Sequence, residues 1–230
     1  MGKSNRAVPR LRGVGAAVRY AGDVQPMPST LETPRLRLRP RDGRDAAWNL
    51  ALLAEHPPES APRAHDDQQV ELDDEQVELD DEQVELDDEQ VRLDDEQLRL
   101  DEQRRRFDEV GFGLYTVELA ETGEAAGYCG LIVGRASAAQ PELAYELLRA
   151  HVGNGYATEA AGVVAEAAFE AGFPVVWATV ETWNAPSFGV LAKLGFTTTR
   201  RVSGDGRKVL VWMRRRAPRR RHREAPAAAG

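Results

Sequence analysis

Apolar and polar residues alternate in several short runs along the chain, and this alternation predicts β-strands. The clearest run covers residues 35–40, where leucine alternates with arginine up to a proline. Residues 111–119 and 126–133 flank a Glu-Thr-Gly-Glu turn and are expected to form a hairpin. Such runs, bounded by glycine, proline and acidic turn residues, are typical of strands. Four more strands are predicted, over residues 143–148, 175–180, 196–202 and 208–213.

Three stretches with helical character separate these strands. Residues 42–55 form an amphipathic pattern that ends at a pair of prolines. Residues 155–171 are rich in alanine and end at Gly172, and residues 186–194 end at Gly195. Glycine and proline commonly end a helix, because proline cannot continue it and glycine readily adopts the left-handed backbone that closes it. The sequence therefore predicts an α/β domain.

An acidic heptad interrupts this pattern. The unit Asp-Asp-Glu-Gln-Val-Glu-Leu begins at Asp73, repeats almost unchanged to Gln90 and decays towards Gln103. Its valines and leucines recur at steps of two and five, whereas a coiled-coil seam needs steps of three and four. On a helix they would form two thin stripes on opposite sides, and neither would bury much surface. We interpret residues 66–103 as an inserted acidic segment that is either a solvated helix or disordered; the alternative is a self-associating or partner-binding arm.

Charge separates the chain into three parts. Residues 66–103 hold 19 acidic and 2 basic residues, although the net charge of the whole chain is only −8. Residues 1–27 hold five basic residues and one acidic residue, and residues 214–230 hold seven basic residues and one acidic residue. We expect residues 1–26 to be a disordered basic extension and residues 214–230 to be a disordered basic tail. Residues 27–213 are expected to form the domain that carries the acidic insertion.

Composition excludes several classes of protein. Cys129 is the only cysteine, which excludes an intramolecular disulfide framework and a site built from several cysteine ligands. It lies in the apolar run 127–133, where a packed core thiol is the simplest interpretation. No apolar stretch approaches the roughly 18 residues that span a bilayer, and the basic N-terminus lacks the apolar core of a secretory signal. The expectation is a cytoplasmic protein with no membrane contact and no metal.

The strongest local signal is the turn Gly153-Asn154-Gly155, which lies between a predicted strand and the long alanine-rich helix. Glycine lets the backbone approach a ligand closely, and the first turn of a helix leaves several N–H groups unpaired. Together they form a cradle for an anion such as a pyrophosphate. Other phosphate-binding patterns fit less well, because no Gly-x-x-x-x-Gly-Lys-Ser/Thr motif is present and Thr158 stands where a dinucleotide fingerprint needs its third glycine.

A second motif follows the next predicted strand. It reads Asn184-Ala-Pro-Ser187-Phe, and then Leu-Ala-Lys-Leu-Gly-Phe over residues 191–196. Together with the glycine turn, it resembles the GNAT superfamily of N-acetyltransferases, and within it the RimJ/RimL type that acetylates protein N-termini. The resemblance covers residues 31–213 apart from the acidic repeat. Four further segments match this type in order, namely residues 33–39, 111–114, 127–131 and 142–145.

This resemblance implies a fold and a co-substrate. The fold is α/β, with a mixed, largely antiparallel central sheet flanked by helices, and the co-substrate is acetyl-CoA. Asn184 is expected to bridge the pantetheine arm and the start of the following helix. The strand near Leu147 and Leu148 is expected to pair with the pantetheine amides. The pyrophosphate is expected to be held by the backbone N–H groups of Val152, Gly153, Asn154, Gly155, Tyr156 and Ala157.

The resemblance also implies direct transfer of an acetyl group to a primary amine in a ternary complex. Glu142 matches the residue that deprotonates the amine, commonly through water, and Ser187 matches the hydroxyl proposed to protonate the departing thiolate. Alternatively, Glu142 is a solvated charge at a strand end, and Ser187 only supports the first turn of its helix. Glu146 is a weaker candidate for the base. Many relatives use a downstream tyrosine as the acid, but no tyrosine follows Tyr156, which favours Ser187.

The acceptor is less well defined. A protein N-terminus, an aminoglycoside and a small metabolite amine all stay open, because the acidic repeat occupies the segment that shapes the acceptor groove in this family. The acidic segment could attract a basic acceptor, such as the N-terminus of a ribosomal protein. The tail of residues 214–223 could contact RNA or the ribosome, but it lacks interleaved aromatic residues. Two other functions also stay open: a non-catalytic acyl-CoA-binding protein and an interaction protein built on the charged repeat.

Overall fold

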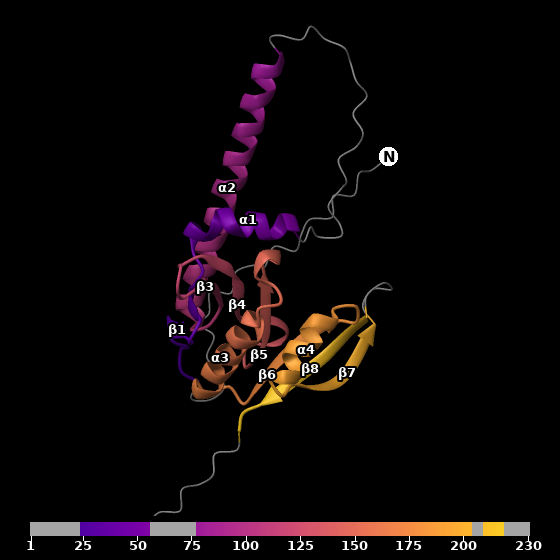
Figure 1. Cartoon of the computed structure of the whole chain (residues 1–230). Helices are drawn as coiled ribbons and strands as arrows, with labels where there is room; N and C mark the ends of the chain where they lie inside the picture. The colour runs from indigo at the N-terminus through magenta and orange to yellow at the C-terminus, as the bar shows by residue number, and fades with distance from the viewer. Residues whose placement is uncertain (1–23, 56–76, 204–208, 219–230) are drawn as a thin grey trace, which may run out of the picture.

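The structure is a computed structural model that describes residues 24–55, 77–203 and 209–218 (Figure 1). The predictions for residues 1–23 and 219–230, and for the acidic repeat before residue 77, lie outside these residues. No helix in the described part of the chain has the length and apolar character needed to cross a membrane.

The described residues form one mixed sheet of eight strands in the order β1-β2-β3-β4-β5-β6-β8-β7. Neighbouring strands run antiparallel, except β5 and β6, which are parallel. The sheet confirms the predicted α/β fold with a mixed, largely antiparallel centre. Each predicted strand is present with slightly shifted ends, and the short strand β1 is additional. The bounds are β1 Leu31–Glu32, β2 Leu36–Pro40, β3 Leu114–Leu119, β4 Ala125–Ser137, β5 Gln140–Leu147, β6 Val175–Glu181, β7 Thr197–Ser203 and β8 Val209–Arg216.

Helices pack around this sheet. The 15-residue helix α3 contacts β4 and β5, and α4 lies beside α3. Helix α1 contacts β4 and also packs against α2. The predicted helix over residues 42–55 begins with a short 3-10 turn, η1. The bounds are η1 Gly43–Asp45, α1 Ala46–Glu55, α2 Val77–Val110, η2 Arg149–His151, α3 Tyr156–Glu170 and α4 Ala185–Lys193.

The central strands present two different faces, because successive side chains of a strand point to opposite sides of a sheet. Cys129 and Leu143 belong to the same buried core as Val164 of α3. Tyr128 points the other way, and the guanidinium carbon of Arg41 lies 4.8 Å from the centre of its ring, beside α1. We call these two sides the α3 face and the α1 face. The thiol of Cys129 is fully enclosed, and burial raises its pKa.

Helix α3 approaches the sheet closely because its inner side is made of small residues. Ala160, Ala161, Val164 and Ala168 are completely buried. The cluster that they join includes residues from all the central strands. Small side chains leave no thick layer between helix and sheet, and close packing of this kind recovers contact with many atoms at once. The helix that follows the glycine turn is thereby fixed against β4 and β5.

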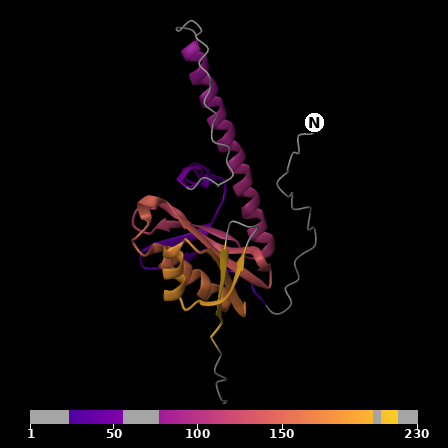
Figure 2. The ribbon, with the colours of Figure 1, turned by 90° about the vertical axis from the view of Figure 1, so that its right-hand side faces the viewer.

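The acidic repeat is where the structure differs most from the sequence analysis, because part of it is a helix with a buried side. Residues 77–103 are helical and continuous with the rest of α2, which measures roughly 50 Å at 1.5 Å per residue. The first half of α2 extends away from the sheet (Figure 1 and Figure 2). Further along, Glu96, Leu100 and Phe107 are buried. Their steps of four and seven place them on one side of the helix. The spacing of valines and leucines in the heptad does not reveal this buried stripe, because one of its members is a glutamate.

Glu96 is buried because it has hydrogen-bond donors around it. The Nδ2 group of Asn49 in α1 donates to Glu96 Oε1 at 2.6 Å, and the Nε group of Arg99 donates to Glu96 Oε2 at 2.8 Å. Arg41 donates in turn to the Oδ1 atom of Asn49. A buried carboxylate is tolerated only with such partners. A late copy of the heptad is therefore built into the domain, and the described part of α2 that precedes it projects from the sheet.

Two ends of the domain lie beyond the expected limits. Strand β8 continues to Arg216, and the N–H of Ala217 donates to the carbonyl of Pro174 at 3.0 Å. The first residues of the expected basic tail therefore belong to the sheet. Before Met27, the N–H of Gln25 donates to the carbonyl of Ala171 at 2.7 Å. Strand pairing uses backbone groups, so an arginine-rich sequence can extend a strand despite its charge.

Candidate active site

Strands β5 and β6 separate in the middle of the sheet. They are in register at a single pair, Glu142 opposite Trp177, whereas β6 pairs with β8 along its whole length. Beyond that pair, β5 runs on to Leu147 and β6 to Glu181. Parallel strands normally exchange evenly spaced hydrogen bonds. The split therefore leaves backbone groups of both strands available to an extended ligand.

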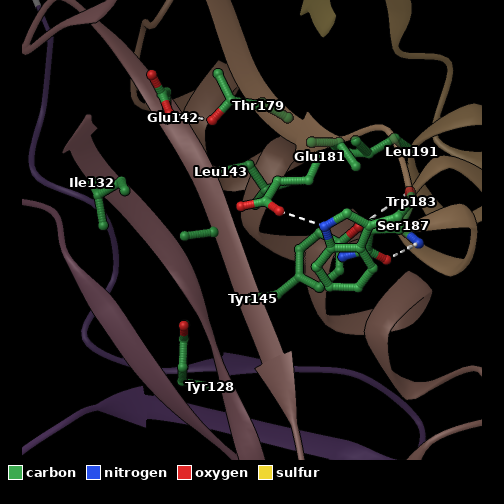
Figure 3. A pocket seen from close by; sticks show the side chains of 14 residues that line it. Tyr128, Ile132, Glu142, Leu143, Tyr145, Thr179, Glu181, Trp183, Ser187 and Leu191 are labelled. Atoms are coloured by element: carbon green, nitrogen blue, oxygen red, sulfur yellow. Dashed lines mark hydrogen bonds between the residues drawn. The ribbon is translucent and has the colours of Figure 1, made fainter. Parts of the chain in front are cut away.

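A pocket of about 280 Å³ lies at this split (Figure 3). Its wall includes Tyr145 of β5, on the α3 face, and Glu142 of the same strand, on the α1 face. Asn184 and Ser187 of the α4 region complete the wall on the α3 face. Since residues from both faces line one cavity, the pocket passes between the two strands. It brings together Glu142, Asn184 and Ser187, three of the residues predicted from the sequence.

Glu142 is held in a fixed position. Only 3% of the residue is exposed, and Thr179 on β6 donates its hydroxyl to Glu142 Oε2 at 3.1 Å. On β4, a Cβ atom at Gly134 would lie 2.6 Å from both the Cδ and the Oε2 atoms of Glu142. Real Cβ contacts are longer than this, so glycine at 134 makes room for the carboxylate. This environment differs from that of a solvated charge at a strand end.

Ser187 lies in the first turn of α4, which Asn184 caps. The Oδ1 atom of Asn184 accepts a hydrogen bond from the Ser187 N–H at 3.1 Å, and Pro186 supplies a backbone angle suited to a helix start. The backbone of Ser187 therefore has the structural role that the sequence allowed. Its hydroxyl is a separate group on the pocket wall, and the Nδ2 group of Asn184 can still donate to a ligand.

Tyr145 is a pocket residue that the sequence analysis did not single out. Its hydroxyl donates to the carbonyl of Ser187 at 3.3 Å. Burial raises the pKa of Tyr145, although the hydrogen bond to Ser187 opposes this rise. The phenol therefore keeps its proton at neutral pH. A search for a tyrosine downstream of Tyr156 could not find it, because β5 brings it to α4 from an earlier part of the chain.

The glycine turn has the geometry of an anion cradle. Gly153 and Gly155 have φ angles of 89° and 81°, in the left-handed region that favours glycine. Gly155 is the N-cap of α3. Among the described residues, no acceptor takes a hydrogen bond from the N–H groups of residues 153–157. Several donors and the positive end of a helix dipole are thus available to a pyrophosphate, as the sequence predicts for this turn.

Other backbone groups named from the sequence already have partners. The N–H of Val152 donates to the carbonyl of Arg149 at 3.2 Å. Leu148 donates its N–H to the carbonyl of Ala126 at 2.9 Å and accepts from the N–H of His151 at 2.8 Å. Of the backbone groups predicted to bind the cofactor, these contacts engage those of Val152 and Leu148. None of these residues lines the pocket; Leu147 lies on β5 two residues beyond the lining residue Tyr145.

Arg35 connects β2 to the glycine turn. Its Nη1 group donates to the carbonyl of Asn154 at 3.0 Å, and its Nε group donates to Glu159 Oε2 at 2.7 Å. The guanidinium carbon lies 4.8 Å from the centre of the Tyr156 ring. Burial acts to raise the pKa of Glu159, but the hydrogen bonds from Thr33 and Arg35 outweigh it and lower that pKa. Arg35 therefore holds the turn and the first turn of α3 together.

No group of three or more histidine, cysteine, aspartate or glutamate side chains in the described ranges is arranged to hold a metal ion. The chemistry described above depends on carboxylate, hydroxyl and backbone groups.

Comparison with solved structures shows where this fold occurs. A GnaT-family acetyltransferase from Bordetella pertussis is 23% identical, covers 82% of this chain and 99% of its own, and superposes with a TM-score of 0.59. The yncA protein of Salmonella typhimurium, solved with its cofactor acetyl-CoA, is 20% identical, with coverage of 84% and 99% and a TM-score of 0.54. RimJ of Mycobacterium smegmatis, solved with CoA-disulfide, is 22% identical, with coverage of 79% and 82% and a TM-score of 0.57.

A search of curated proteins found no match. The family model described as the acetyltransferase (GNAT) domain matches residues 35–197, which include both halves of the site. The free N–H groups of the glycine turn, the split between β5 and β6 and the capped start of α4 fit a phosphate-bearing thioester with an extended arm. The chain belongs to the GNAT acetyltransferase family, and acetyl-CoA is its co-substrate.

Proposed function

We propose that this protein transfers the acetyl group of acetyl-CoA to a primary amine by direct attack within a ternary complex. One observation carries the proposal: a single pocket at the split in the sheet is lined by a buried carboxylate, Glu142, and by the Ser187 hydroxyl at the start of α4. The first group can remove a proton from an amine, and the second can deliver a proton to a thiolate. A site that only stored acyl-CoA would have no need of this pairing.

The binding residues position the donor. The N–H groups of residues 153–157 hold the pyrophosphate, and the helix dipole of α3 adds to the attraction. The backbone of Leu147 and the Nδ2 group of Asn184 hold the extended arm along the split. Acetyl-CoA supplies the activated acyl group. Because donor and acceptor are held side by side, much of the rate enhancement comes from positioning.

Glu142 serves as the general base on the α1 face. Its carboxylate accepts a proton from the acceptor amine, directly or through one water, while the Thr179 hydroxyl keeps it oriented. Ser187 serves as the general acid on the α3 face, where α4 and β5 enclose it. The amine proton therefore leaves on one side of the sheet and the thiol proton arrives on the other. Solvent then returns a proton to Ser187 and takes one from Glu142.

We infer that the acceptor is the α-amine of a protein, as in the RimJ/RimL type. The order of motifs from residue 33 to residue 196 supports this inference, and RimJ of Mycobacterium smegmatis shares the fold over most of the chain. A ribosomal protein is the acceptor that this type suggests. The projecting acidic part of α2 would attract such a basic partner at long range.

The experiment is an acetyl-CoA turnover screen over peptide and small-amine acceptors, with free thiol as the readout. Glu142→Gln is expected to lower kcat by about 100-fold or more, since general-base catalysis contributes roughly 10²–10⁴. Glu146→Gln is the matched control on the same face of β5. Ser187→Ala tests the acid. Coenzyme binding without thiol release for any acceptor would instead identify a non-catalytic acyl-CoA-binding protein.

The role of the projecting helix needs a separate test. Residues 77–90 comprise two heptads, so their deletion preserves the register of the buried stripe that begins near Glu96. If the helix attracts a basic acceptor, the deletion lowers kcat/KM for a basic peptide at low salt and has little effect at high salt. Equal kinetics at both salt concentrations would exclude recruitment. Partner capture that survives replacement of Gly153 and Gly155 would favour an interaction protein.

A further inference from the structure

Helix α2 has an apolar stripe on the side that faces away from the domain. Val91 is 58% exposed and Leu98 is 69% exposed. At about 100° per residue, both side chains lie roughly opposite Leu100, which is completely buried. Val77 and Val84 hold the same heptad position in the sequence. Large apolar side chains that recur along one exposed surface are typical of a surface that binds a partner.

Acidic residues flank this stripe on both sides. Asp94 and Asp95 are exposed and lie about 40° and 60° from Leu98, in opposite directions around the helix. We call Val91, Asp94, Asp95 and Leu98 the outer face of α2. Two outer faces would repel each other, because like charges placed together are costly. This face therefore needs a partner surface that is basic and partly apolar.

A surface of this kind lies on the α1 face of the sheet, in the half that ends at β7. Thr179 of β6 contacts Glu142 and so lies on the α1 face. Trp212 of β8 is opposite Thr179, and Trp177 comes two residues before Thr179 on β6. Both indoles therefore lie on the same face. Their rings pack edge to face, with centroids 5.6 Å apart.

Two arginines stack on these indoles. The guanidinium carbon of Arg200 in β7 lies 4.3 Å from the centre of the Trp212 ring, and that of Arg214 in β8 lies 5.5 Å from the centre of the Trp177 ring. Arg200 is exposed, and Arg214 and Trp177 are partly exposed. Stacking holds a guanidinium group in place and leaves its edge able to donate hydrogen bonds. We call these four residues the arginine–tryptophan patch.

The patch and the outer face of α2 match in charge and in apolar character. Arginine forms paired, charge-assisted hydrogen bonds with carboxylates, and the outer face supplies two aspartates. The apolar stripe between these aspartates can pack against the exposed part of the Trp177 ring. An interface with an apolar centre and charged borders combines hydrophobic burial with electrostatic attraction.

Single-stranded nucleic acid fits the patch less well. Bases bind proteins by stacking on open aromatic rings, whereas guanidinium groups already stack on both indoles and Trp212 is only 7% exposed. The 19 acidic residues between positions 66 and 103 would also repel the phosphates of a nucleic acid. An acidic helix is therefore the better occupant.

The helix that docks on the patch has to come from another molecule. Helix α2 is one continuous helix that packs against α1 and η1, and its first half extends away from the sheet (Figure 1 and Figure 2). Its outer face is opposite the side that is buried in its own domain. The outer face therefore points away from the sheet that carries the patch.

We propose that two copies of this chain associate about a two-fold axis, with the outer face of α2 in each copy docked on the arginine–tryptophan patch of the other. A strand of eight residues is about 26 Å long and a helix is about 10 Å wide, so each contact covers roughly 260 Å² of either partner. Two such contacts bury about 1,000 Å² in total, near the lower limit for a specific interface. The dimer is therefore weak and sensitive to salt.

The test exchanges the charges of the two surfaces in the full chain. Arg200→Glu with Arg214→Glu makes the patch acidic, and Asp94→Arg with Asp95→Arg makes the outer face basic. Each double variant alone brings like charges together, whereas an equal mixture of the two restores opposite charges at both contacts. In sedimentation velocity at micromolar concentrations and low salt, we expect dimers for the wild type and for the mixture. The dissociation constant of each variant alone should rise by about tenfold or more.

Arg37→Glu, at an exposed position of β2, is the matched control and should dimerise like the wild type. Circular dichroism checks the fold of each variant, and Arg200→Glu alone replaces the patch variant if that one unfolds. A monomeric wild type, a variant that dimerises alone or a mixture that stays monomeric would overturn the proposal. Single-stranded RNA that binds a monomeric wild type but not the patch variant would overturn it in favour of a nucleic-acid surface. The readout does not involve turnover, so none of these results bears on the proposed function.

Discussion

The hydroxyl of Tyr145 donates a hydrogen bond to the backbone carbonyl of Ser187 at 3.3 Å. It joins the free edge of β5 to the first turn of α4 across the pocket. Ser187 is separated from Tyr145 by 42 positions in the sequence. The bond therefore fixes the proposed acid relative to the strand that carries the proposed base.

Removal of this hydroxyl should loosen the site without unfolding it. Tyr145→Phe keeps the ring in the core and leaves the Ser187 carbonyl without its donor, a loss of about 1 kcal/mol. We expect kcat to fall about tenfold, because catalysis depends steeply on position, while the KM for acetyl-CoA changes little. Steady-state kinetics check this. Tyr115→Phe is the matched control, since Tyr115 makes the same kind of bond to the Pro28 carbonyl at 2.7 Å away from the pocket; similar kinetics for both variants would contradict the prediction.

Arg35 should control donor affinity. Arg35→Ala removes the contact that holds the Asn154 carbonyl and the ion pair with Glu159. The N–H groups of the glycine turn then lose their fixed orientation, and we expect the dissociation constant for CoA to rise about tenfold, equivalent to about 1.4 kcal/mol. Calorimetric titration measures it. Arg37→Ala, at an exposed position two residues further along in β2, is the control. Unchanged affinity in the Arg35 variant would show that the turn keeps its shape alone.

Gly134 should act through Glu142. A Cβ atom at this position would come within 2.6 Å of the carboxylate, so Gly134→Ala must displace that group. We expect kcat to fall by about 100-fold, since a misplaced catalytic group can cost that much, with CoA binding intact. In contrast, Gly189→Ala adds a Cβ atom with nothing within 4 Å. Normal turnover in the Gly134 variant would mean that the carboxylate works equally well in a second position.

Glu96 should contribute to stability, whereas its counterpart one heptad earlier should not. Glu96→Gln replaces a buried carboxylate that accepts from Asn49 and Arg99 and is expected to lower the free energy of unfolding by about 1–3 kcal/mol. Glu89→Gln makes the same change at an exposed position of the preceding repeat and should stay within about 0.5 kcal/mol. Urea denaturation compares them. Equal effects would place α2 outside the folding unit.

Asp45 should give stability that depends on pH. It is 99% buried, since only 1% of it is exposed, and accepts hydrogen bonds from Arg39, Thr116 and Trp48. Burial alone would raise the pKa of Asp45, but these bonds outweigh it and lower that pKa. A lowered folded-state pKa stabilises the protein above the unfolded value of about 3.9, and this stabilisation is lost as the pH falls through the lowered pKa.

Asp45→Asn should therefore cost about 3 kcal/mol near pH 7, since it breaks a buried ion pair. The difference from the wild type should stay constant down to about pH 5 and shrink below about pH 4. Urea denaturation at several pH values follows it, with Asp108→Asn, an exposed partner of Arg104, as the control. A difference that does not change with pH would show that packing, and not ionisation, explains the loss.

The sequence by itself determined the strands, the three helices and the glycine turn, because these depend on local periodicity and on residues with special backbone angles. It also proposed Glu142, Asn184 and Ser187 as site residues through a resemblance to a family, and their roles stay predictions. The split between β5 and β6 depends on the pairing of strands that are distant in sequence, and no local pattern records it. Only the tertiary structure therefore brought Glu142 and Ser187 to one pocket.

Contacts between segments that are distant in sequence also explain which residues the sequence analysis did not find. Tyr145 contacts Ser187, Arg35 contacts Asn154, and Asn49 contacts Glu96, and in each pair the partners come from different elements. In α2 the heptad predicts two thin apolar stripes. The side that is buried instead faces α1, because Asn49 of α1 donates a hydrogen bond to Glu96. The hydrogen bond from Asn49 therefore allows the polar residue Glu96 to be buried. Local propensity determined which segments are regular, and contacts between distant segments decided which of their side chains face one another.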